Sequence, residues 1–215
     1  MADIPSLQAD AALWSAAAAE RAGRPLLVLL HGYGADERDL FGLASFLPEE
    51  FVLAAPRAPM APPWPSPGYS WFALEERSAD DITASAQRLL EWLDAATDAD
   101  RIGFLGFSQG AAIALQALRL QPERFDFVVN LSGFVAPGDL PRDAELAGIR
   151  PPVFWGRGTH DDVIPPELVA HTTDWLPAHA ELSGRVYPGL THSVSEQEIL
   201  DVRAFLEKQL ERGTA

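Results

Sequence analysis

The sequence is constrained most by a serine between two glycines, Gly106-x-Ser108-x-Gly110, at the point where an apolar run meets a helical pattern. Residues 102–105 have the length and composition of a buried strand, and from residue 111 onward Ala, Leu and Gln dominate, which favours a helix. A serine in a strand-to-helix turn has a strained backbone that lifts its hydroxyl above the sheet, and flanking glycines prevent collisions with the strand and the helix. The pattern therefore predicts a nucleophilic serine at Ser108.

Apolar runs and helical patterns alternate along the rest of the chain. Runs typical of strands buried in a parallel sheet occupy residues 26–30, 51–54, 127–131, 153–155 and 185–187. Helical patterns lie at residues 36–47, 80–96, 167–175 and 195–210. Residues 1–25 fit a helix or an edge strand equally well. The alternation predicts an α/β protein with a doubly wound, mostly parallel sheet.

Composition narrows the class of protein. The chain has 215 residues, of which 47% are hydrophobic, and no internal repeat or linker, so we expect a single domain over residues 1–215. A net charge of −15 argues against binding to nucleic-acid phosphates.

No apolar run is long enough to span a membrane. The absence of cysteine excludes disulfides, thiol nucleophiles and Cys-ligated zinc. The alanine-rich stretch 11–19 follows Asp3 and Asp10 rather than basic residues, so it does not fit a signal peptide, and we expect a cytoplasmic location.

A serine hydroxyl is a poor nucleophile at neutral pH, so Ser108 needs a base, and the base needs a carboxylate to orient it. In sheets with this type of turn the three residues follow one another in the order Ser, acid, His. His192 lies in the loop between the last predicted strand and a helix with a capping signal, which is the edge of the sheet where such folds carry their sites. His171 lies within a predicted helix, and no feature fixes a role for His179. We therefore expect His192 to be the base.

The acid and the oxyanion donors are expected at the same edge of the sheet. Asp161 and Asp162 both follow the predicted strand 153–155, and position alone does not separate them. Acyl transfer also needs N–H donors directed at the developing oxyanion. The Gln109 backbone N–H at the helix start and the Tyr33 N–H in the turn 31–34 are the two candidates. Both turns leave strand ends on one side of a parallel sheet, so we expect them to converge.

The segment from residue 56 to residue 72 is rich in proline and aromatic residues. Six prolines lie between residues 56 and 67, and the segment holds four aromatic residues of interest, Trp64, Tyr69, Trp71 and Phe72. A stiff surface linker is one interpretation, whereas the aromatic content favours a loop that folds back over an apolar site. No insertion is long enough to form a cap domain, so we expect loops to build the pocket and Trp64 or Trp71 to line it.

Four motifs, in order along the chain, resemble the signature set of the phospholipase/carboxylesterase family, small α/β hydrolases that include bacterial carboxylesterases and acyl-protein thioesterases. They are residues 31–36 (His-Gly-Tyr-Gly-Ala-Asp), 106–110 (Gly-Phe-Ser-Gln-Gly), 158–165 and 189–193 (Gly-Leu-Thr-His-Ser). The resemblance covers residues 26–210 and implies the α/β-hydrolase fold without a cap domain. It also aligns Asp161 with the family's catalytic acid, and places Asp162 where the family usually has proline.

The resemblance implies a serine carboxylesterase that cleaves esters, thioesters or lysophospholipids through Ser108, His192 and Asp161, with no cofactor or metal. The expected partner is a small ester or thioester, with no nucleic acid and no membrane span, and a homodimer is left open. The alternative function is a catalytically inactive binding module of the same fold, which an intact Ser, Asp and His in order disfavours. A nucleotide-binding domain is disfavoured because the glycine spacing does not fit G-x-G-x-x-G and the lone lysine is Lys208.

Overall fold

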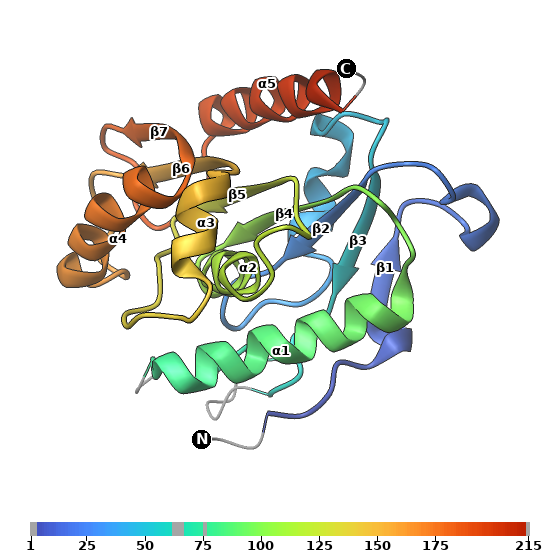
Figure 1. The fold of residues 1–215 in the computed structure, drawn as a ribbon, viewed down its shortest axis with the longest axis horizontal. Helices are drawn as coiled ribbons and strands as arrows, with labels where there is room; N and C mark the ends of the chain where they lie inside the picture. Colours follow the sequence, from blue (N-terminus) through green and yellow to red (C-terminus); the bar gives the residue numbers. More distant parts are fainter. Residues whose placement is uncertain (1–3, 62–66, 75–76, 214–215) are drawn as a thin grey trace.

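The computed structural model describes residues 4–61, 67–74 and 77–213, and these residues form one seven-stranded sheet with helices on both faces (Figure 1). The strand order is β1-β3-β2-β4-β5-β6-β7, with β1 antiparallel to β3 and all other neighbours parallel. The strands are β1 (Ala12–Trp14), β2 (Leu26–Leu30), β3 (Val52–Pro56), β4 (Ile102–Phe107), β5 (Phe127–Leu131), β6 (Pro152–Gly158) and β7 (Glu181–Tyr187). The doubly wound, mostly parallel sheet predicted from the sequence is confirmed.

Alternate residues of the buried strands face two separate cores. Val28, Phe104 and Val128 face the helices of one side, whereas Leu29 and Leu105 face the other side. The first side is covered by α1 (Ala79–Ala96), α2 (Gln109–Leu120), α3 (Asp143–Ile149) and α4 (Pro166–His179). The second side is covered by α5 (Glu196–Arg212) and the 3-10 helix η3 (Leu40–Phe46), and α5 lies opposite α1 and α2 in Figure 1. Burial on both faces explains why these strands are continuous apolar runs in the sequence.

The order of the strands determines where a site can form. After β2 the chain adds β3 on one side and then crosses to place β4 on the other side of β2. The loops that leave β2 and β4 therefore diverge to opposite faces and open a crevice at the carboxyl ends of the two strands. Leu30 and Gly106 are register partners, so the turn after Leu30 and the Ser108 turn begin side by side.

One sequence expectation needs correction, and one open alternative is decided. The helix expected over residues 36–47 is a 3-10 helix over Leu40–Phe46 only. Residues before it are held in a turn, because the Asp36 carboxylate accepts a hydrogen bond from the Arg38 backbone N–H at 2.8 Å, and Gly42 weakens any longer helix. Near the amino end the edge-strand alternative is correct, since β1 is preceded by the short 3-10 helix η1 (Ala9–Ala11) and followed by η2 (Ala18–Glu20).

The remaining differences between the predicted and the observed elements concern the length of two strands and one additional helix. The predicted strands 153–155 and 185–187 are parts of the longer β6 and β7, and α3 had no counterpart among the predicted helices. Within the described part of the chain, no helix combines the length and apolar character needed to cross a membrane. No separate cap domain covers the carboxyl edge of the sheet in these same residues.

Candidate active site

Ser108 lies in the turn between β4 and α2, and its backbone is strained. Its φ of 55° and ψ of −116° lie outside the regions that a non-glycine residue ordinarily occupies. The turn is possible because neighbouring positions carry no side chain. A Cβ on Gly110 would overlap the Leu30 carbonyl oxygen, and a Cβ on Gly106 would overlap the backbone of Ala111. The strand-serine-helix turn predicted from the sequence is therefore present.

The structure brings Ser108, His192 and Asp161 into one hydrogen-bonded chain. The distance from His192 Nε2 to Ser108 Oγ is 2.9 Å, and the distance from His192 Nδ1 to Asp161 Oδ2 is 2.8 Å. An ionised carboxylate only accepts hydrogen bonds, so Nδ1 carries the proton and Nε2 is left free to accept the Ser108 O–H. This is the tautomer that a general base needs.

The other carboxylate oxygen of Asp161 is also held. Oδ1 accepts hydrogen bonds from the backbone N–H groups of Val163 at 3.0 Å and Ile164 at 3.3 Å. Burial by itself raises the pKa of the Asp161 carboxyl, but the hydrogen bonds from His192 and from the two backbone N–H groups outweigh burial, and the net shift is downward. Asp161 therefore stays ionised beside the imidazole.

The competing candidates lie elsewhere. Asp162 is exposed, and the carboxylate that pairs with His192 is that of Asp161. His171 lies within α4, as expected. His179 ends α4, and its Nδ1 lies 2.8 Å from the Trp175 carbonyl oxygen.

The two expected oxyanion donors border the same cavity as Ser108 and His192. Gln109 is the first residue of α2, where backbone N–H groups have no partner within the helix and the helix dipole is positive. Tyr33 lies in the turn after β2. The two turns follow the carboxyl ends of the parallel strands β2 and β4, on one side of the sheet as the sequence pattern predicts, and the structure shows that these strands are neighbours.

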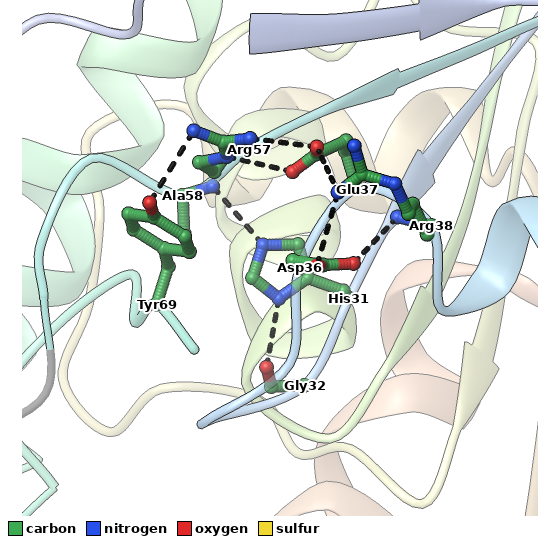
Figure 2. Close-up of polar contacts among 8 residues, drawn as sticks. All are labelled: His31, Gly32, Asp36, Glu37, Arg38, Arg57, Ala58 and Tyr69. Atoms are coloured by element: carbon green, nitrogen blue, oxygen red, sulfur yellow. Dashed lines mark hydrogen bonds and ion pairs between the residues drawn. The ribbon is translucent and has the colours of Figure 1, made fainter. Parts of the chain in front are cut away.

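The turn that carries Tyr33 is held by His31, which is buried under it (Figure 2). The His31 Nδ1–H donates to the Gly32 carbonyl oxygen at 2.8 Å, and Nε2 accepts the Ala58 backbone N–H at 3.0 Å. Burial lowers the pKa of His31, although the Gly32 carbonyl and nearby carboxylates oppose the shift. His31 is thus a neutral side chain with one fixed tautomer, and it joins the turn to the end of β3.

An ion pair between Arg57 and Glu37 holds the chain just after the same turn. The Arg57 guanidinium binds the Glu37 carboxylate through two hydrogen bonds of 2.7 Å and lies 3.3 Å from the Tyr69 hydroxyl (Figure 2). The hydrogen bonds from Arg57 lower the pKa of the buried Glu37 to about 2. Sequence reasoning missed this pair, because the partners are twenty residues apart and no local pattern connects them.

A cavity of about 160 Å³ opens beside Ser108. Besides Ser108, His192, Tyr33 and Gln109, the lining is mostly apolar. It comprises Phe72, Leu74, Phe107, Phe134, Val163 and Ile164, together with the charged Arg77. Trp71 is absent from the residues that border the cavity, and its indole Nε1–H donates inside the protein to the His31 carbonyl oxygen at 2.9 Å. The expected lining role therefore falls to the neighbouring Phe72, and Trp64 lies outside the described residues.

A family model described as Phospholipase/Carboxylesterase matches residues 14–210. The chain belongs to the phospholipase/carboxylesterase family. It is thus a hydrolase of the esterase type with the α/β-hydrolase fold. Within the described residues no group of three or more His, Asp or Glu side chains is placed to hold a metal ion.

Two proteins named acyl-protein thioesterase 1 are similar over most of the chain. Acyl-protein thioesterase 1 of Debaryomyces hansenii is 30% identical over 175 residues, covering 73% of this chain and 75% of the relative. Acyl-protein thioesterase 1 of Mycosarcoma maydis is 31% identical over 222 residues, with coverage of 85% and 90%.

Solved structures show the same fold. Esterase PE8 has a TM-score of 0.74 at 26% identity and covers 95% of this chain and 99% of its own. The Bacillus cereus carboxylesterase has a TM-score of 0.78 at 21% identity, covering 92% of this chain and 93% of that one.

Proposed function

We propose that this family member cleaves carboxylic esters or thioesters through an acyl-enzyme formed on Ser108. The observation that carries the proposal is the continuous hydrogen-bonded chain from Asp161 through His192 to Ser108 at the edge of an apolar cavity. The strained backbone of Ser108 supports it, since such strain is costly and is typical of functional positions.

The proposed reaction has two halves. Ser108 Oγ attacks the acyl carbon while His192 Nε2 takes its proton, and the Tyr33 and Gln109 N–H groups donate to the resulting oxyanion. The tetrahedral intermediate then collapses, the bond to the alcohol or thiol breaks, and His192 returns the proton to that leaving group. In the second half, a water molecule attacks the acyl carbon of the acyl-enzyme while His192 Nε2 takes its proton. The bond to Ser108 Oγ then breaks, His192 returns the proton to Ser108, and the carboxylic acid is released.

Asp161 has an electrostatic task in both halves. When His192 holds the extra proton, the imidazolium is stabilised by the ionised carboxylate 2.8 Å away. The two backbone N–H groups that hold Asp161 keep the carboxylate in place through the cycle.

The cavity supports a short or medium acyl chain as the substrate's acyl part. Its walls are largely apolar and its volume is about 160 Å³. Each methylene buried there contributes up to about 0.8 kcal/mol, so kcat/KM rises with chain length until the cavity is full. The family relatives named acyl-protein thioesterase 1 and the structures named carboxylesterase or esterase support thioesters and esters respectively.

The test is hydrolysis of paired p-nitrophenyl esters and acyl thioesters of graded chain length, with Ser108→Ala as the control. We expect turnover by the native protein with an optimum at short or medium acyl chains. Turnover on the Ser108→Ala variant is expected to fall by about 10³- to 10⁶-fold. A native protein that hydrolyses none of these substrates contradicts the proposal and favours the binding module instead.

A further inference from the structure

The side chain of Gln109 takes no part in the mechanism above, which uses only its backbone N–H. It is nevertheless 2% exposed and hydrogen-bonded at both of its polar atoms. Oε1 accepts the Trp71 backbone N–H at 3.0 Å, and Nε2 donates to the Phe72 carbonyl oxygen at 2.9 Å. One side chain therefore binds the backbone of residues 71–72 to the first residue of α2.

The segment 68–72 is also bound to the other oxyanion turn. The Tyr69 N–H donates to the Ala35 carbonyl at 2.8 Å, and the Gly34 N–H donates to the Tyr69 carbonyl at 2.8 Å. The Trp71 indole N–H donates to the His31 carbonyl at 2.9 Å. Residues 31–35, which include Tyr33, are thus tied to this segment through both backbone and side-chain hydrogen bonds.

Segment 68–72 therefore bridges the two turns that supply the proposed oxyanion donors. The spacing between those donors matters, because each must lie 2.7 to 3.1 Å from the position of the oxyanion. The strands β2 and β4 are hydrogen-bonded neighbours, but beyond their ends the chain leaves on opposite faces and the ladder no longer fixes the spacing. The bridge replaces the ladder at that point.

We infer that the Gln109 side chain is a positioning residue, which sets the distance between the Tyr33 and Gln109 N–H groups through segment 68–72. The inference rests on the proposed function, since it concerns the oxyanion of that reaction. Loss of the bridge leaves the nucleophile, base and acid in place, because Ser108, His192 and Asp161 make no hydrogen bond to the segment among those the structure shows for the described residues.

A purely structural role is the competing explanation, since any buried amide that loses its partners destabilises the protein. The same helix offers a matched control. Gln116 is 1% exposed, its Nε2 donates to Thr83 Oγ1 at 2.7 Å, and its Oε1 accepts from Arg119 at 3.2 Å. Gln116 does not border the cavity. Replacing each glutamine by methionine removes two buried hydrogen bonds at similar side-chain volume.

The experiment measures kcat and KM on one ester, the thermal midpoint, and the inhibition constant of an alkyl trifluoromethyl ketone. Such a ketone forms a tetrahedral adduct with a serine, and the adduct carries an oxyanion. For Gln109→Met we expect kcat to fall by about 10- to 100-fold with KM changed by less than about threefold, because a donor displaced by about 1 Å costs mainly transition-state stabilisation. The ketone should bind more weakly by the same factor as kcat/KM.

The Gln116→Met control should lower the thermal midpoint comparably and leave kcat and ketone affinity within about twofold of native. Equal stability losses in the two variants, with native kcat and ketone affinity in Gln109→Met, would overturn the inference. Should Gln109→Met fail to fold, Trp71→Phe decides the question, since it removes the indole N–H to His31 and part of the buried indole volume. Trp71 makes no hydrogen bond to Ser108, His192 or Asp161 among those that the structure shows for the described residues. Trp71→Phe should lower kcat and the affinity for the ketone together. A kcat and a ketone affinity equal to those of the native protein would overturn the inference.

The proposed function fails separately. A native protein that neither hydrolyses esters nor binds the ketone overturns the function and this inference with it. A native protein that does both, beside a Gln109→Met variant equal to it, overturns the inference alone.

Discussion

Glu198 provides a quantitative test of the structure outside the active site. It lies in the first turn of α5, its side chain is 0% exposed, and neither carboxyl oxygen has a hydrogen-bond partner among the described residues. The carboxyl lies against β6, since a Cβ on Gly156 would overlap Glu198 Oε1. Burial raises the pKa of Glu198 to about 7, and the charge of Asp201 adds to the rise, whereas the nearby Ser195 backbone opposes it.

The size and sign of the effect on stability follow from that pKa. The folded protein holds the proton more tightly than the unfolded chain, in which the ordinary value is 4.5. The stabilising contribution of the protonated carboxyl is therefore complete below pH 4.5 and is lost as the pH rises through 7. The whole loss is about 3 kcal/mol, of which about 2 kcal/mol falls between pH 5.5 and 8.5.

Glu198→Gln removes the ionisation and keeps the shape of the side chain. We expect the free energy of unfolding of the variant, relative to native, to grow by about 2 kcal/mol between pH 5.5 and 8.5. The corresponding gain in thermal midpoint is about 4 to 8 °C for a chain of this length. Urea unfolding at four or five pH values in this range measures the free energy directly and stays above the sequence pI of about 4.6.

The control is Glu196→Gln, which removes an exposed carboxylate from the same helical turn. The difference in the free energy of unfolding between Glu196→Gln and the native protein should change little over the same pH range. The free energy of unfolding of Glu198→Gln relative to native could also be independent of pH. In that case the Glu198 carboxyl does not change its ionisation between pH 5.5 and 8.5, and the reasoning from burial is refuted.

Three further predictions concern the site. Asp161→Asn should lower kcat far more than Asp162→Asn, by roughly 10⁴-fold if the imidazole is left in the wrong tautomer, and steady-state assays of the two variants compare them directly; the reverse order would transfer the acid's role to Asp162. His192→Ala should abolish turnover while His179→Ala stays within a few-fold of native, and a folded His179→Ala variant without activity would contradict the assignment. Phe72→Ala should shift the optimum of kcat/KM towards longer acyl chains, since it enlarges the apolar cavity, and an unchanged chain-length profile would show that Phe72 does not limit it.

The strands and the position of the site could be predicted from the sequence because they depend on local signals. A strand buried on both faces must be an unbroken apolar run, as in residues 26–30 and 127–131, and both runs are strands in the structure. The turn at Ser108 is equally local, since its strain requires particular small residues at fixed distances. The order of strands then brought Ser108, His192 and Asp161 to one edge.

The features that could not be predicted depend on contacts between distant parts of the chain. Apolar spacing over residues 36–47 favoured a helix, but the side chains of Asp36 and Glu37 are engaged by Arg38 and Arg57, and only a 3-10 helix forms. Composition marked Trp71 as a wall of the pocket, whereas its indole N–H is used inside the protein and Phe72 borders the cavity. Neighbouring residues in a loop point in different directions, and composition does not show which one faces the site.

The central claim is that all covalent chemistry takes place at Ser108 Oγ. An alkyl fluorophosphonate added to the native protein should react once per chain, and mass spectrometry of the digested protein should place the adduct on Ser108, because only this hydroxyl is hydrogen-bonded to His192 among the described residues. Ser108→Ala, with an unchanged thermal midpoint, should show no adduct. An adduct on a different residue, or labelling of Ser108→Ala at the native rate, would contradict the account.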